Sequence, residues 1–207
     1  MRSKLFRRYN RPRQRFATFG TVALLLLAAT AHGEARRYEV AGSKTLVQFQ
    51  LRHLLGTVVG RFHEVKAVLE VDPNAPEHSS VSVTIPSRTV ETDNRTRDKH
   101  LRTELFEVAK YPTITFRSRS VTRTGRDQAD VLGDLTLHGV TKPLLLHVTS
   151  LGVSKNSAGV EISRWRATGG TFKRRDFGLV WSKGVEAISM IGDDITLKIE
   201  AEAVRSE

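Results

Sequence analysis

Residues 133–143 read Gly-Asp-Leu-Thr-Leu-His-Gly-Val-Thr-Lys-Pro. Leu135 and Leu137 alternate with polar residues, a period of two that buries one face of a strand and leaves the other in water. Gly139 follows at once and tolerates a positive φ, so the stretch predicts a tight turn into a second strand. This stretch therefore indicates a hairpin of an antiparallel sheet.

The same two-residue alternation recurs along the chain on both sides of this hairpin. Turn-forming residues such as Asp72-Pro73-Asn74 and Thr124-Gly125-Arg126 separate the strands. Many short, regularly spaced strands predict an all-β sandwich or a closed antiparallel barrel of about eight strands, and periodicity alone does not choose between them. The clearest alternating segments are Leu46–Leu51, Val65–Val71, Ser80–Ile85, Thr113–Arg117 and Ile195–Glu202.

One segment, near residues 94–108, departs from the strand pattern. Leu101, Leu105 and Val108 are spaced at i, i+4 and i+7 with charged residues between them, as on one face of a helix. Thr92, Asp93 or Asn94 can cap its start, and Pro112 prevents its continuation. We therefore expect a short amphipathic helix inserted in the β-domain.

The first 31 residues have the features of a secretory signal peptide. A basic segment up to Arg15 precedes the apolar run from Thr21 to Ala31, and the run is too short to span a bilayer easily. We expect cleavage after Ala31 or Gly33, a single domain over residues 36–204, and a periplasmic location. The basic residues of the leader are Arg2, Lys4, Arg7, Arg8, Arg11, Arg13 and Arg15.

The composition excludes several classes of protein. The net charge of +11 comes mostly from the leader: without its seven basic residues, 26 basic residues face 22 acidic ones, a net charge of +4. Nucleic acid is therefore not an expected partner. The chain has no cysteine, which excludes disulfides and thiolate chemistry. The histidines show no short metal-binding spacing, and we expect no metal site.

Four motifs follow one another in a fixed order along the chain: Asn94–Leu101, Tyr111–Ser118, Gly133–Pro143 and Arg174–Leu179. Together with Phe49, His53, Gly60 and Phe62 upstream, they resemble the YceI-like family of secreted bacterial proteins. The resemblance covers roughly Tyr38 to Ala203 and implies a lipocalin-like barrel that encloses a polyisoprenoid, such as an isoprenoid quinone or prenyl diphosphate.

An apolar interior would dissolve a prenyl tail, because each buried CH₂ group contributes about 0.8 kcal/mol. We expect the inward-facing apolar residues to line the site, although for each one taken singly plain core is the simpler interpretation. The lining residues expected from the alternation are Phe49, Leu51, Phe62, Leu69, Ile85, Phe116, Leu135, Leu137, Leu146, Ile162 and Phe172.

A second group of residues is polar and could form a mouth that orients the lipid head group. Arg97 and His100 are three residues apart and would share a helix face. The competing interpretation is that these residues cap and anchor the helix, and that Arg174 forms an ion pair at a barrel end. The predicted mouth comprises His53, Asn94, Arg97, Asp98, His100 and Arg174.

Three functions are therefore compatible with the sequence. The first is a carrier that binds a long isoprenoid lipid without chemistry, has no catalytic residues and requires no cofactor. It would touch a membrane surface briefly during lipid exchange, and a homodimer is compatible with it. The second is an enzyme for a lipophilic substrate with His53 or His100 as its acid–base group. The third is an envelope stress scaffold whose barrel is filled by side chains.

Overall fold

The computed structural model describes residues 35–41, 44–53, 56–182, 184, 186 and 191–206. The predicted signal peptide and both cleavage sites lie outside the described residues. The elements along the chain are β1 (Arg36–Ala41), β2 (Leu46–His53), β3 (Gly56–Phe62), β4 (Lys66–Val71), η1 (Pro76–His78), β5 (Ser80–Pro86), η2 (Ser87–Thr89), α1 (Arg95–His100), η3 (Leu101–Leu105), β6 (Thr113–Arg123), β7 (Gln128–Leu137), β8 (Val140–Lys155), β9 (Glu161–Gly169), β10 (Phe172–Lys173), η4 (Arg174–Phe177) and β11 (Asp194–Arg205).

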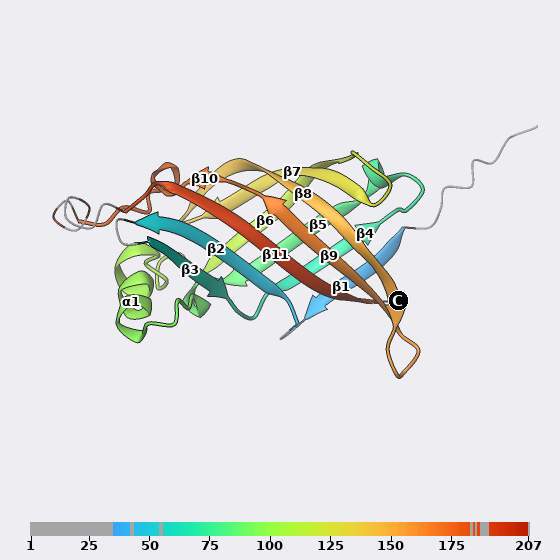
Figure 1. Ribbon diagram of the computed structural model, residues 1–207, viewed down its shortest axis with the longest axis horizontal. Helices are drawn as coiled ribbons and strands as arrows, with labels where there is room; N and C mark the ends of the chain where they lie inside the picture. The colour runs from blue at the N-terminus through green and yellow to red at the C-terminus, as the bar shows by residue number, and fades with distance from the viewer. Residues whose placement is uncertain are drawn as a thin grey trace, which may run out of the picture. The chain divides into compact units, whose positions relative to one another are not determined.

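The strands form one antiparallel sheet that closes on itself. Its order runs β1-β4-β5-β6-β7-β8-β9-β11, and β11 pairs with β1 to complete a ring of eight strands. This confirms the expected barrel of about eight strands and settles the choice left open by periodicity. Closure leaves the ring without free edges, and Figure 1 shows the strands tilted around the interior.

The hairpin β2–β3 extends this ring at one end. β2 pairs with the first half of β11, from Leu51 opposite Ile195 to Leu46 opposite Glu200, while β1 pairs with its last residues. β1 and β2 therefore follow one another along the same edge of β11. On the far side of β3, a single bridge joins Arg61 to Glu91, through two backbone hydrogen bonds of 2.8 and 2.9 Å.

The turn predicted from residues 133–143 joins β7 to β8. His138 and Gly139 both have positive φ, 52° and 76°, which is the geometry of a type I′ turn. Its tight twist brings Leu137 opposite Val140 and starts a ladder that continues to Gln128 opposite Thr149. The local sequence thus sets the register of the longest hairpin in the described chain.

The predicted helix is shorter than its apolar spacing suggested. Asn94 caps α1 by accepting a hydrogen bond from the Arg97 N–H at 3.0 Å. The last turn, η3, is a π-turn, in which Phe106 N–H donates to Leu101 O at 2.8 Å. Leu101 and Leu105 still face the core, but the helical segment ends at Leu105 rather than near Val108.

The barrel has two distinct ends, which Figure 1 places on opposite sides. The helix end is the one that carries α1 and η3. The turn end is formed by the β6–β7 turn (residues 124–127) and by η1, and Arg123 Nη2 links the two by donating to Pro73 O at 2.8 Å.

Candidate ligand cavity

A cavity of about 600 Å³ lies inside the barrel. Its volume is in the range of small-molecule binding sites, about 300–1,000 Å³. Its lining residues on β6 run from Ile114 to Arg123, nine steps of about 3.4 Å each, or roughly 30 Å. The site is therefore long, apolar and aligned with the barrel. The scaffold hypothesis requires an interior filled by side chains, and this cavity does not fit it.

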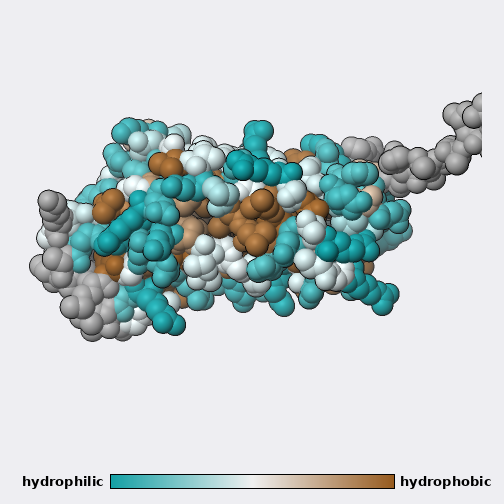
Figure 2. Space-filling view, turned by 90° about the horizontal axis from the view of Figure 1, so that it is seen from above, coloured by the Kyte–Doolittle hydropathy of each residue, from teal (hydrophilic) through white to brown (hydrophobic). Residues whose placement is uncertain are grey.

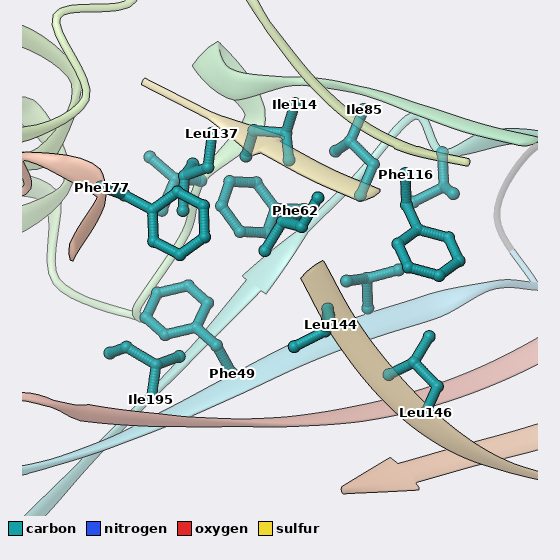
Figure 3. Close-up of a cluster of buried hydrophobic side chains, with 14 of the residues drawn as sticks. Phe49, Phe62, Ile85, Ile114, Phe116, Leu137, Leu144, Leu146, Phe177 and Ile195 are labelled. Atoms are coloured by element: carbon teal, nitrogen blue, oxygen red, sulfur yellow. The ribbon is translucent and has the colours of Figure 1, made fainter. Parts of the chain in front are cut away.

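Ten of the eleven apolar residues expected to line the interior do so. At the helix end the rings of Phe49 and Phe62 pack together, with their centroids 5.6 Å apart, and Figure 3 shows these two rings converging between the strands. Whether these side chains contact a ligand stays a prediction. The ten are Phe49, Leu51, Phe62, Leu69, Ile85, Phe116, Leu135, Leu137, Leu146 and Phe172.

The prediction for Ile162 was wrong. Ile162 is buried but does not line the cavity. The pairing of β9 with β11 places Ser163 opposite Ala203, and Trp165 opposite Ala201. Because side chains alternate across a strand, the inward set on β9 contains Ser163, Trp165 and Ala167, and Ile162 belongs to the outer face.

At the helix end, Thr92, Arg97 and Asp98 form a closed hydrogen-bond network. The buried Asp98 carboxylate accepts from the Thr92 N–H at 2.8 Å and from its hydroxyl at 2.6 Å. Arg97 donates through Nε to Thr92 Oγ1 and through Nη2 to Thr92 O, both at 2.7 Å. Thr92 and Arg97 line the cavity, whereas Asp98 does not. Asp98 therefore anchors the start of α1, as the structural interpretation expected.

Asn94 and His100 do not reach the cavity. Asn94 is exposed, and its side chain caps α1. His100 is exposed on α1, although Arg97 three residues earlier is half-buried and lines the cavity. The expectation that these residues form a shared polar mouth was therefore wrong, because the helix turns only the Arg97 side of its surface inward. The enzyme hypothesis also loses His100 as an acid–base group.

Arg174 lines the cavity but is fully engaged by the protein. Nε donates to Gly192 O at 2.8 Å, and Nη1 donates to Leu179 O and Glu186 Oε1, both at 2.7 Å. Nη2 donates to Glu186 Oε2 at 2.7 Å and to Ile191 O at 3.3 Å. These bonds use all five guanidinium N–H groups, so Arg174 has no donor left for a head group. Arg174 therefore forms an ion pair at a barrel end, as the competing interpretation expected, and its acidic partner is Glu186.

His53, at the end of β2, is half-buried and lines the cavity. Within the described ranges it is the histidine that lines the cavity, and its contact with a head group stays a prediction. Another histidine has a structural role that the sequence did not reveal: His138 contacts Glu107 Oε2 through Nε2 at 2.8 Å and Phe177 O through Nδ1 at 3.2 Å. It thereby connects the β7–β8 turn to the segment after η3 and to η4.

The turn end carries polar residues that the sequence analysis did not assign to the site. Arg123, Arg126, Asp127 and Gln128 all line the cavity and are exposed, so the cavity reaches the surface here. A turn sequence does not show by itself that its residues line a cavity, because only closure of the barrel places the turn at the mouth of the cavity.

In the described part of the chain, no helix is both long and apolar enough to cross a membrane. Nor does any group of three or more His, Asp or Glu residues among the described residues have the arrangement of a metal site.

A closed antiparallel barrel around one elongated apolar cavity defines a lipocalin-like binding protein. Residues 38–203 match the profile of the YceI-like domain, and the chain belongs to this family. A UPF0312 protein of Pectobacterium atrosepticum is 32% identical over 188 residues, which cover 90% of this chain and 94% of the relative. Protein YceI of Salmonella arizonae is 31% identical over 191 residues, covering 91% and 96% of the two chains.

Solved structures share the same fold. The YceI protein of Campylobacter jejuni has a TM-score of 0.62 and 35% identity, covering 72% of this chain and 85% of its own. BcnA of Burkholderia cenocepacia has a TM-score of 0.68 and 21% identity, covering 79% and 98%. A domain of Saccharophagus degradans, described as polyisoprenoid-binding, has a TM-score of 0.61 and 18% identity, covering 82% and 98%.

Proposed function

We propose that this protein is a periplasmic carrier that holds a long isoprenoid lipid, of the quinone or prenyl-diphosphate type, without chemical change. The observation that carries the proposal is the apolar cavity, which follows the barrel for roughly 30 Å along β6. The polyisoprenoid-binding description of the Saccharophagus degradans domain supports the ligand class. The basic, then apolar, N-terminal segment supports export.

The thermodynamics of a prenyl tail suit storage and transfer. Each buried CH₂-sized group contributes about 0.8 kcal/mol, so even a short tail gains a large gross free energy, reduced by the entropy of ordering the chain. Release should therefore be slow in water and faster where a bilayer can accept the tail. Brief contact with a membrane surface is thus part of the proposal.

A small apolar area on the outer surface fits such contact. Leu132 of β7 and Leu145 of β8 pair across the strands on the outer face, where they are 37% and 43% exposed. Figure 2 shows apolar side chains gathered midway along the face seen from above, between polar ones. A homodimer stays a prediction from the sequence.

The direct test is to purify the mature protein without detergent, extract it with organic solvent, and identify bound lipid by mass spectrometry. Ala167→Phe projects a ring into the cavity, whereas Thr168→Phe places the same ring on the exposed face of β9. We expect Ala167→Phe to lower the bound lipid several-fold and Thr168→Phe to leave it unchanged. Absence of any prenyl lipid, with no uptake of added quinone by the wild type, would refute the proposal.

The His53→Ala variant distinguishes the carrier function from the enzyme alternative. A carrier keeps its lipid chemically unchanged in both the wild type and this variant. Conversion of a bound lipid by the wild type, lost in His53→Ala while binding persists, would show catalysis instead.

A further inference from the structure

The Trp165 indole has a hydrogen-bond donor without a partner inside the barrel. Trp165 lines the cavity, and its Nε1 atom is buried with no acceptor among the described residues. Buried donors are almost always satisfied, and an orphan that lines a binding cavity indicates an acceptor supplied from outside the chain. Among the described residues, no other side chain that lines the cavity has a buried hydrogen-bond donor without a partner.

Trp165 lies near the turn end of the barrel. It pairs with Ser150 on β8 and with Ala201 on β11. The Ser150 N–H in turn donates to Asp127 O at 2.8 Å, within the β6–β7 turn. Ser150 therefore contacts the β6–β7 turn, and Trp165 lies beside Ser150 on the next strand. This places the indole near the exposed residues that line the cavity at the turn end.

The two ends offer different environments to a polar head group. At the helix end, Arg174 has used all its donors, and Leu101 and Leu105 of the α1–η3 segment are buried. The other polar side chains that line the cavity there, Arg97 and His53, are half-buried, and Arg97 is held by Thr92 through Nε and Nη2. At the turn end, the cavity is lined by the exposed Arg123, Arg126 and Asp127. A head group there keeps contact with water, while its tail lies among the apolar side chains deeper in the barrel.

We propose that the lipid binds with its head at the turn end, where an oxygen of the head group accepts a hydrogen bond from Trp165 Nε1, and with its tail pointing toward α1. This inference rests on the proposed carrier function and adds an orientation and a recognition residue. The chemistry required is an isoprenoid with an acceptor oxygen at its head. A quinone carbonyl and a phosphoryl oxygen both supply it, and Arg126 would add affinity for the phosphoryl oxygen only.

The chain contains its own control, because its two tryptophans line opposite parts of the cavity. Trp165 is near the turn end, and Trp181 is near Arg174, where its backbone N–H donates to Glu186 Oε1 at 3.0 Å. Trp165→Phe and Trp181→Phe each remove one indole and keep an aromatic ring. The probes are a short-chain ubiquinone and a prenyl monophosphate of matched tail length, titrated into delipidated protein.

We expect Trp165→Phe to raise the Kd for both probes about fivefold, the effect of one neutral hydrogen bond. Thr168→Phe, on the exposed face of the same strand, should leave both Kd values unchanged. Arg126→Gln should weaken binding of the prenyl monophosphate and leave binding of the ubiquinone unchanged. Thermal unfolding of both tryptophan variants within about 3 °C of the wild type shows that the fold is intact.

Quinone quenching of indole fluorescence reports the orientation directly, since it requires close approach of the two rings. The Trp181→Phe protein, which emits from Trp165, should be quenched strongly, and the Trp165→Phe protein weakly. The reverse pattern, or an unchanged Kd in Trp165→Phe, overturns the orientation and leaves the carrier function standing. Failure of the wild type to bind either probe overturns both.

Discussion

Arg174 and Glu186 form a bidentate ion pair, with Nη1–Oε1 and Nη2–Oε2 distances of 2.7 Å. The Arg174 side chain is 1% exposed and that of Glu186 13% exposed. Because Arg174 also donates to the carbonyls of Leu179, Ile191 and Gly192, one buried guanidinium organises the chain between η4 and β11. The motif that resembled a ligand contact in the sequence therefore holds the barrel end together.

Arg174→Lys should destabilise the protein strongly. Lysine has a single ammonium group and cannot reproduce the planar fork that bonds Glu186 and three carbonyls. Breaking such a buried pair costs about 3–5 kcal/mol, measured as the free energy of unfolding in urea. Arg175 is the matched control: it donates to the same Glu186 oxygen but is 53% exposed, so Arg175→Lys should cost less than about 1 kcal/mol. Equal losses in the two variants would contradict this assignment.

The same pair predicts a pH dependence. The hydrogen bonds from Arg174 lower the pKa of Glu186 from 4.5 to about 2. Because the folded-state pKa lies below the unfolded one, ionised Glu186 stabilises the fold above about pH 4.5, and this contribution is lost as the pH falls toward 2. Urea unfolding from pH 7 to pH 3 should show Glu186→Gln less stable by about 2–3 kcal/mol at pH 7 and progressively closer to the wild type in acid.

A control for the pH experiment is Glu104→Gln, since Glu104 is exposed on η3. Its unfolding curve should follow the wild type across the whole range. A gap between wild type and Glu186→Gln that stays constant down to pH 3 would mean that the carboxylate charge is not what stabilises this end.

Two glycines allow aromatic rings to lie over the sheet, and alanine at each should have a different cost. A Cβ at Gly133 would lie 2.5 Å from the Arg117 carbonyl oxygen, whereas the three atoms nearest to a Cβ at Gly60 all belong to the Phe49 ring. The backbone cannot move aside, but the ring borders the cavity and can turn into it. We expect Gly133→Ala to lose about 1–3 kcal/mol and Gly60→Ala less, by thermal unfolding. Gly125→Ala, facing the flexible Gln128 side chain, should be nearly neutral.

Asn94 and His100 should separate capping from ligand binding. Asn94→Ala removes the acceptor for the Arg97 N–H and should cost about 1 kcal/mol in urea unfolding. His100→Ala should change stability by less than about 0.5 kcal/mol, because His100 is exposed. Neither change should alter lipid affinity, since neither residue lines the cavity. Loss of lipid binding in His100→Ala would contradict this and show that His100 contacts the lipid head group.

Much of the fold could be predicted from the sequence because its signals are local. The period of two identified the strands, and Gly139 identified the turn whose positive φ values start the β7–β8 ladder. Ten of the eleven expected lining residues line the cavity, since inside and outside alternate along each strand. The prediction for Ile162 was wrong because the segment from Glu161 lacks clean alternation, and only pairing with β11 decided which face of β9 turned inward.

The polar part of the site depended on contacts between residues far apart in the sequence. Arg174 looked like a ligand contact until folding brought Glu186 and three carbonyls to it. Trp165 and Arg126 were not assigned to the site, because only closure of the ring brings β9 and the β6–β7 turn to one end of a cavity. By itself, the sequence determined an alternating β-chain with a capped helix and an apolar interior. The tertiary structure decided which polar groups are already satisfied and which are left to a ligand, because a hydrogen-bond donor is used up only by the partner that folding places within reach.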